Sequence, residues 1–215
     1  MEMNSVVFDL DGTLIDSAPD IHASVNRMLA AESHQPLDLP TITCFIGNGL
    51  PNLVARVMKT LHIDMAEHTR LTAATLAQYH AAPADLTLVY PGVTEALTEL
   101  RNSGHRLGVC TNKPEAPARE ILSLLNLAQH FDVIIGGDSL PTRKPDPAML
   151  TASFDALGSP GTYVGDSEVD AETAHRAGAD FLLFTQGYCH VPFDQLPHRA
   201  MFDHFDMLPA LVAPR

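Results

Sequence analysis

The chain has 215 residues, enough for one large domain or for a core with a smaller inserted unit. Hydrophobic residues make up 46% and charged residues 18% of the sequence, a balance that excludes disorder on a large scale. The formal net charge of -13 argues against a nucleic-acid or anionic-membrane partner, because both require Lys and Arg to neutralise phosphates. No secretory leader or membrane-spanning run is recognisable, so we expect a cytoplasmic protein.

An apolar run near the N-terminus leads directly into two carboxylates. Val6, Val7 and Phe8 are typical of a fully buried strand in a parallel sheet. Asp9 and Asp11 follow this strand at once, and carboxylates in a low-dielectric site either stay protonated or need a cation. The stretch therefore predicts either a metal site or a working acid.

Residues 16–87 show no convincing strand pattern. Apolar residues at helical spacing predict helices over residues 21–29 and 50–61, and a weaker third helix that begins near Asp64. We expect a helical cap domain over 16–87, inserted directly after the first strand, where it could act as a lid.

From residue 90 onwards, strand and helix patterns alternate. The strands are expected at 106–111, 132–137, 162–166 and 180–185, and the helices at 91–104, 114–126, 146–158 and 168–178. An edge strand near residues 200–203 and a short last helix complete the chain. This alternation predicts an α/β fold with a doubly wound parallel sheet, whose core comprises residues 1–15 and 88–215.

Polar residues follow the predicted strands at their carboxyl ends, where open parallel sheets bind their ligands. These residues are Asp9, Asp11, Thr111, Asn112, Asp138 and Asp166, joined by Lys144 before a helix and by Asp170 one turn into the next helix. Carboxylates bind a hard divalent cation such as Mg²⁺, and the cation and a lysine together neutralise a phosphate. The set is typical of phosphoryl transfer.

Four motifs of the chain, DLDGTL, a strand ending in TN, KPDP and GDSEVD, occur in that order. They resemble the four motifs of the haloacid dehalogenase superfamily of phosphohydrolases, over nearly the whole chain. The resemblance implies that Asp9 is the nucleophile that forms an aspartyl-phosphate, and that Asp11 protonates the leaving alcohol and then activates water. It further implies that Thr111 hydrogen-bonds the phosphoryl oxygens and that Lys144 offsets the charge there.

The same resemblance implies a Mg²⁺ cofactor. Asp9, the backbone carbonyl of Asp11, and Asp166 would hold the ion, with Asp170 acting through water or orienting the other ligands. Backbone amides around Leu10 and Asn112 would contribute to an anion-binding nest.

Simpler interpretations stand beside these roles. Thr111 and Asn112 are common at strand ends and turns, and Lys144 could be a solvated loop charge. Asp170 in a helix's first turn is favourable with the helix dipole and needs no metal. Arg56 and Lys59 in the insert fit a solvated helix face.

The substrate is expected to be a small phosphorylated metabolite. Gly47, Asn48 and Gly49 form a turn before the second helix of the insert, and this loop resembles the substrate-facing lid loop of phosphoglycolate phosphatases. Asp16 and Ser17 match that subgroup as well. We therefore expect hydrolysis of 2-phosphoglycolate, or of a similarly small phosphomonoester, by a monomer or homodimer.

Two alternatives remain open at this stage. The first is a beta-phosphoglucomutase-like phosphosugar mutase or a sugar-phosphate phosphatase; the mutase usually carries an arginine in the lid loop, and none lies between Phe45 and Ala55. A receiver-type signalling module also gathers aspartates, a threonine and a lysine around Mg²⁺, but its order of motifs and its length differ.

Overall fold

The chain divides into two compact units. In the computed structural model, which describes residues 5–212, the sheet unit comprises residues 5–16 and 89–212, and the helical unit is Ser17–Leu88. The chain crosses from one unit to the other near two short strands, β2 (Ile15–Asp16) and β3 (Leu88–Val89), which form a two-stranded sheet.

The sheet unit is built on six parallel strands in the order β5-β4-β1-β6-β7-β8. The strands are β1 (Ser5–Phe8), β4 (Arg106–Cys110), β5 (Val133–Ile135), β6 (Gly161–Gly165), β7 (Asp180–Phe184) and β8 (Ala200–Phe202). This order is that of a doubly wound sheet, whose ligands bind where the winding reverses beside the central strand. The predicted fold class is confirmed, and β1 is the central strand.

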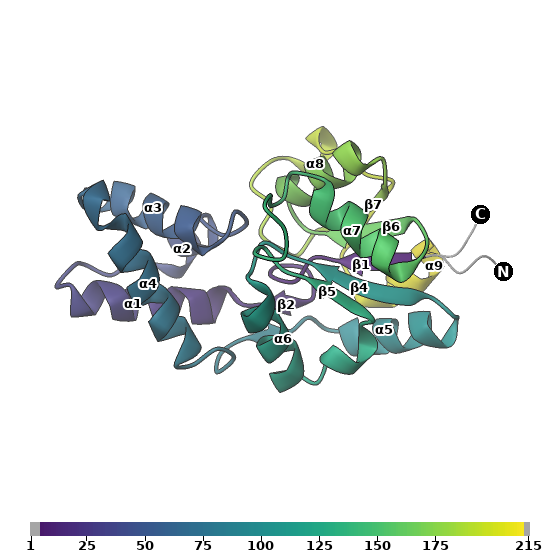
Figure 1. Cartoon of the computed structure of the whole chain (residues 1–215), viewed down its shortest axis with the longest axis horizontal. Helices are drawn as coiled ribbons and strands as arrows, with labels where there is room; N and C mark the ends of the chain where they lie inside the picture. Colours follow the sequence, from purple (N-terminus) through teal and green to yellow (C-terminus); the bar gives the residue numbers. More distant parts are fainter. Residues whose placement is uncertain (1–4, 213–215) are drawn as a thin grey trace. The chain divides into compact units, whose positions relative to one another are not determined.

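Helices cover both faces of this sheet (Figure 1). On one face α7 packs against β4 and β5 and α8 against β6 and β7, while α5 and α6 pack against β4 and β5 on the other. The helices are α5 (Val93–Asn102), α6 (Glu115–Leu124), α7 (Ala148–Leu157), α8 (Glu168–Ala177) and α9 (Leu208–Val212), with 3-10 turns η2 (Ala128–His130), η3 (Phe193–Gln195) and η4 (Phe205–Met207). These layers exclude water from β1, so the site at its end rests on a dry core.

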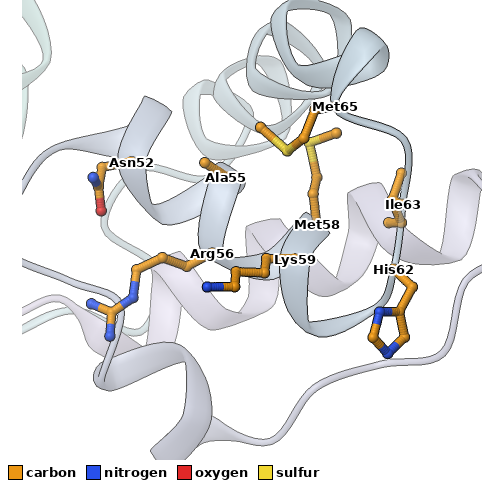
Figure 2. Close-up of a pocket in the computed structure, with 8 residues that line it drawn as sticks. All are labelled: Asn52, Ala55, Arg56, Met58, Lys59, His62, Ile63 and Met65. Carbon is orange, nitrogen blue, oxygen red and sulfur yellow. The ribbon is translucent and has the colours of Figure 1, made fainter.

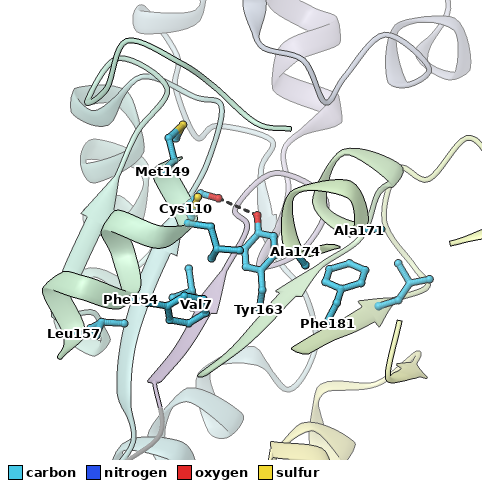
Figure 3. Packing of buried hydrophobic residues seen from close by; sticks show 11 residues of the cluster. Val7, Cys110, Met149, Phe154, Leu157, Tyr163, Ala171, Ala174 and Phe181 are labelled. Atoms are coloured by element: carbon cyan, nitrogen blue, oxygen red, sulfur yellow. Dashed lines mark hydrogen bonds between the residues drawn. The ribbon is translucent and has the colours of Figure 1, made fainter. Parts of the chain in front are cut away.

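The core between the sheet and α7 consists of large apolar side chains (Figure 3). Val7 of β1, Tyr163 of β6 and Phe154 of α7 are all at most 9% exposed. The Tyr163 ring lies in this cluster, and its hydroxyl donates to the carbonyl of Cys110 at 3.2 Å. Tyr163 therefore connects the apolar core with the polar end of the sheet.

Four α-helices make up the helical unit. They are α1 (Ala18–Ala31), α2 (Leu39–Thr43), α3 (Leu50–Thr60) and α4 (His68–His80), and the 3-10 turn η1 (Met65–Glu67) precedes α4. The helices α1 and α3 both pack against α4. The buried carboxylate of Asp20 accepts bonds from the Leu86 and Thr87 amides and from the Thr87 hydroxyl, which ties the end of this unit to its beginning.

The structure corrects several boundaries expected from sequence. The four predicted strands stop one or two residues earlier, because Thr111 and Asp166 already leave the sheet at its carboxyl edge. The helix α2 was not expected; its signal is Asp38, whose side chain accepts from the Thr41 amide at 2.9 Å. The predicted edge strand and last helix are confirmed as β8 and α9.

Candidate active site

Asp9 lies immediately after β1 at the carboxyl edge of the sheet. Its amide donates to the carbonyl of Val164 at 2.9 Å, so the backbone is still held by the neighbouring strand β6. Its buried carboxylate accepts from the Lys144 ammonium at 2.7 Å. The structure thus brings the Lys144 ammonium to the carboxylate that follows β1.

Lys144 is fixed at both its backbone and its ammonium group. The Asn112 side chain accepts from the Lys144 amide at 3.0 Å and donates to its carbonyl at 3.2 Å. The ammonium donates to Asp9, to the Tyr163 hydroxyl at 2.9 Å and to Asp170 at 2.7 Å. Although burial alone would lower the pKa of Lys144, the Asp170 and Asp9 charges raise it, so the group stays an ammonium. The Asn112 side chain is thus committed to positioning this lysine.

Asp166 follows β6 and lies fully buried. One of its oxygens accepts from the Thr13 hydroxyl at 2.9 Å, and the other accepts from the Tyr188 amide at 2.6 Å. Gly12 has φ +92°, and a Cβ there would lie 2.5 Å from the Asp166 Oδ2. A Cβ at Gly187 would lie 2.3 Å from the Asp166 Cβ. Glycine is required at both positions for the backbone to approach this carboxylate.

Asp170 is surrounded by hydrogen-bond donors. One oxygen accepts from Lys144 and from the Tyr163 hydroxyl at 2.8 Å, and the other accepts from the Ser167 hydroxyl at 2.7 Å and two backbone amides. Ser167 and Asp170 form the capping box that begins α8. Burial raises the pKa of Asp170, but Lys144 and these bonds outweigh it and hold that pKa below the ordinary value. Because both carboxylate oxygens of Asp170 already accept hydrogen bonds, this residue is better suited to orienting its neighbours than to binding a metal directly.

The three buried carboxylates form a group that can hold a cation. Asp9, Asp166 and Asp170 offer oxygen atoms that all lie within 4.8 Å of one another. Burial raises the pKa of Asp9 to about 7, with Lys144 opposing and Asp170 adding to the shift. Burial and the charges of Asp170 and Asp9 likewise raise the pKa of Asp166 well above its ordinary value. Three carboxylates facing one ammonium leave an excess of negative charge that a divalent cation would neutralise, so the residues fit such an ion.

Asp11 is paired with a lysine that the sequence reasoning missed. The Lys113 ammonium donates to both oxygens of Asp11, at 2.9 and 3.0 Å, and both side chains are largely buried. Lys113 directly follows Thr111 and Asn112, so its position just after the end of a strand could have identified it as a candidate site residue. The buried hydroxyl of Thr111 accepts from the Lys113 amide at 3.2 Å.

Asp138 does not join the acidic group, although its place after a predicted strand suggested that it would. Its carboxylate accepts from the Glu115 amide at 2.7 Å and thereby satisfies a free N–H at the start of α6. Asp146 likewise accepts from the Ala148 amide at 3.0 Å, and α7 begins at Ala148.

The residues of the predicted lid loop lie in the helical unit. Gly47 has φ 122° and Gly49 has φ 79°, and Gly49 is the N-cap residue of α3, with Asn48 between them. Both glycines adopt conformations that other residues avoid, as a tight turn requires. Arg56, further along α3, lies over the ring of Phe45 at 4.7 Å from its centroid.

A separate pocket of about 580 Å³ lies on the helical unit, along α3 and the loop that follows it (Figure 2). Its polar groups come from Asn52, Arg56, Lys59 and His62, and its apolar lining includes Met58 and Met65. Its lining contains no carboxylate and no residue of the acidic group. The acidic residues to which the sequence analysis assigns phosphoryl transfer are therefore not part of this pocket.

Tyr188 links the acidic group to the end of β2. Its amide donates to Asp166, and its hydroxyl donates to the Asp16 carboxylate at 2.7 Å. Asp16 thus has a structural partner within the sheet unit. In the part of the chain that the structure describes, no helix has the length and apolar character needed to cross a membrane.

Comparison with known proteins agrees with this geometry. Residues 6–184 match the family model described as haloacid dehalogenase-like hydrolase. The chain is 54% identical over 213 residues to a phosphoglycolate phosphatase of Cereibacter sphaeroides, covering 98% of each chain. It is 43% identical to the phosphoglycolate phosphatase of Rhodobacter capsulatus, covering 97% of this chain and 96% of the relative.

Solved structures show the same fold. The crystal structure of a predicted phosphoglycolate phosphatase from Haemophilus somnus superposes with a TM-score of 0.93, at 29% identity and 99% coverage of both chains. The receiver-type alternative is inconsistent with a hydrolase family match of this extent. The chain belongs to the haloacid dehalogenase-like hydrolases.

Proposed function

We propose that this hydrolase is a magnesium-dependent phosphatase that acts on 2-phosphoglycolate through an aspartyl-phosphate at Asp9. The observation that carries the chemistry is the group formed by Asp9, Asp166 and Lys144: a carboxylate nucleophile, an acidic partner for a cation, and an ammonium that holds the nucleophile. The observation that supports the substrate is the name shared by relatives that cover nearly the whole chain at 43% and 54% identity.

The proposed reaction has two steps. A carboxylate oxygen of Asp9 attacks the phosphorus atom, the bond from phosphorus to the ester oxygen breaks, and Asp11 gives a proton to the departing alkoxide. Water then loses a proton to Asp11 and attacks the phosphorus of the aspartyl-phosphate, which releases inorganic phosphate and restores Asp9. Lys144 offsets negative charge beside Asp9 in both steps, and the Thr111 hydroxyl is available to the phosphoryl oxygens.

Mg²⁺ is the cation that best suits these oxygen ligands, and when bound it would neutralise charge on the transferring phosphoryl group. Asp9, the Asp11 carbonyl and Asp166 would hold it. Asp170 would orient its neighbours or act through water, because its own oxygens already accept from Lys144, Tyr163 and Ser167.

The helical unit would serve as the cap that selects the substrate. Gly47, Asn48 and Gly49 would face the organic part of the phosphomonoester. One observation favours the mutase-like alternative: Arg56 stacks on Phe45, beside that loop, although the loop itself has no arginine. The substrate screen decides between the two.

The test is phosphate release by the purified protein from a panel of small phosphomonoesters, with kcat/KM for each. We expect 2-phosphoglycolate to rank first and an excess of chelator to abolish turnover. Asp9→Asn, prepared identically, controls for contaminating phosphatases. A clear preference for a sugar phosphate would replace the proposed substrate, and full activity in chelator would overturn the metal requirement.

A further inference from the structure

The sheet unit contains two lysines at the site, and their ammonium groups pair with different carboxylates. Lys144 donates to Asp9, Tyr163 and Asp170, so its three N–H groups all have acceptors. Lys113 instead donates to both oxygens of Asp11. Lys144 therefore acts where the phosphoryl group is attacked, and Lys113 lies beside the residue proposed to protonate the leaving group.

The position of Lys113 is set by its backbone on both sides. Its amide donates to the Thr111 hydroxyl at 3.2 Å, and its carbonyl accepts from the Gly137 amide at 2.8 Å. The side chain is 9% exposed and that of Asp11 is 14% exposed, so this pair is more open to an incoming ligand than Lys144, at 2%. An ammonium that is fixed in place and still partly exposed is suited to pair with an anionic group of the substrate.

The substrate class requires such a cation. In a carboxylated phosphomonoester such as 2-phosphoglycolate, a single methylene carbon separates the ester oxygen from the carboxylate. Because this spacing is short, the ammonium bonded to Asp11 would be placed to pair with the substrate's carboxylate when Asp11 reaches the ester oxygen. A carboxylate that enters a largely buried site already rich in Asp residues is unfavourable unless a cation pairs with it.

We propose that Lys113 is the specificity-determining residue for a carboxylated phosphomonoester, its ammonium bridging Asp11 and the carboxylate of the substrate. This inference rests on the proposed phosphatase function and adds to it the residue that recognises the substrate's carboxylate. It assigns that recognition to the sheet unit, in addition to any contribution from the cap loop.

The test compares two esters of equal length, 2-phosphoglycolate and 2-hydroxyethyl phosphate, which differ in having a carboxylate or a hydroxymethyl group. In the wild type, kcat/KM should favour 2-phosphoglycolate. Lys113→Met should reduce that preference by about a hundredfold, the scale expected when one member of a buried charge pair is removed. Lys113→Arg keeps the charge and should retain part of the preference.

A matched control is Arg119→Met, which removes one positive charge from the same unit. Arg119 forms an exposed pair with Glu115 on α6 and lies outside the site, so the ratio of the two kcat/KM values should stay that of the wild type. Thermal melting of each variant checks that the fold is retained.

Two results would overturn the inference. An unchanged ratio of the two kcat/KM values in Lys113→Met, with the wild type still preferring 2-phosphoglycolate, would remove Lys113 from recognition and leave the proposed function standing; if both values fall equally, Lys113 acts only through Asp11. If the wild type had nearly equal kcat/KM values for 2-phosphoglycolate and 2-hydroxyethyl phosphate, recognition of the carboxylate would be excluded, even if Lys113→Met failed to fold. Failure of the proposed substrate is distinct: the wild type would then turn over other phosphomonoesters but not 2-phosphoglycolate.

Discussion

Two groups of paired charges, one in each unit of the molecule, lie in opposite environments. In the sheet unit, the Lys144 ammonium lies 2.7 Å from both Asp9 and Asp170, and all three side chains are at most 9% exposed. In the helical unit, Arg70 lies 2.6 Å from Glu32, but these side chains are 55% and 27% exposed. The distances between the paired charges are similar, but the two pairs differ in their exposure to solvent.

Solvent decides what each pair does. Water screens the exposed pair of Arg70 and Glu32, and pairs of this kind contribute little to stability. The buried carboxylates near Lys144 cannot be screened, so their pKa values shift and each depends on the charge of the others. A concentration of costly buried charge indicates a functional site, whereas the exposed pair is consistent with ordinary surface.

The largest effect should come from removing the proposed nucleophile. Asp9→Asn deletes the attacking oxygen's charge and should lower kcat/KM by at least about a thousandfold, since no neighbouring group replaces a lost nucleophile. Its melting temperature should stay near that of the wild type, because the substitution also relieves repulsion from Asp170 and Asp11. Activity comparable with the wild type would refute the assignment of Asp9.

Breaking the buried pairs should strongly destabilise the sheet unit. Lys144→Met leaves Asp9 and Asp170 without their shared ammonium, and we expect a loss of about 3–5 kcal/mol in the free energy of unfolding. Urea denaturation followed by circular dichroism measures this. A loss as small as that of a surface substitution would show that the buried and exposed pairs are energetically alike.

The response to Mg²⁺ should depend on pH in the sheet unit. The pKa of Asp9 rises from 3.8 in the unfolded chain to about 7, so the folded protein binds an extra proton between these values. The stabilisation from this proton is complete below about pH 4 and is lost as the pH rises through about 7. The raised pKa of Asp166 acts in the same direction.

Mg²⁺ competes with that proton for the same carboxylate. The cation should therefore raise the melting temperature more at pH 8 than at pH 5, as differential scanning fluorimetry with and without Mg²⁺ would show. The variant Asp9→Asn serves as the control, because its pH dependence should be weaker. Equal shifts at the two pH values in the wild type would contradict a cation site at Asp9.

The smallest effect should come from the exposed pair of the helical unit. Arg70→Ala removes the partner of Glu32 and Glu67, and we expect a melting temperature within error of the wild type because solvent already screens these charges. Turnover should also be unchanged. A marked loss of stability would mean that this surface network matters as much as the buried one.

Much of the site was predictable because the carboxyl ends of parallel strands share one edge of a sheet. That rule predicts from the sequence alone that Asp9, Thr111 and Asp166 lie near one another. It was wrong for Asp138, which also follows a strand but caps α6. Strand ends are identified from sequence, but the direction in which a side chain leaves the strand is not.

The hydrogen-bond partners that the site residues find among buried side chains could not be predicted from sequence either. Tyr163 lies on a buried strand and its sequence context indicates only packing, yet its hydroxyl reaches Lys144 and Asp170. Lys113 was missed because lysines in loops are usually solvated. Neither residue belongs to a local pattern that distinguishes it from an ordinary one.

Local patterns in the chain are sufficient to specify the alternation of strands and helices, the parallel sheet and the acidic residues at its edge, because hydrophobic periodicity acts over a few neighbouring residues. The pairing of charges is different. Asp9 and Lys144 are separated by 135 positions, and Asp11 and Lys113 by 102. Which lysine serves which aspartate depends on distances between atoms and on the exclusion of water, and both arise only when the whole chain has packed.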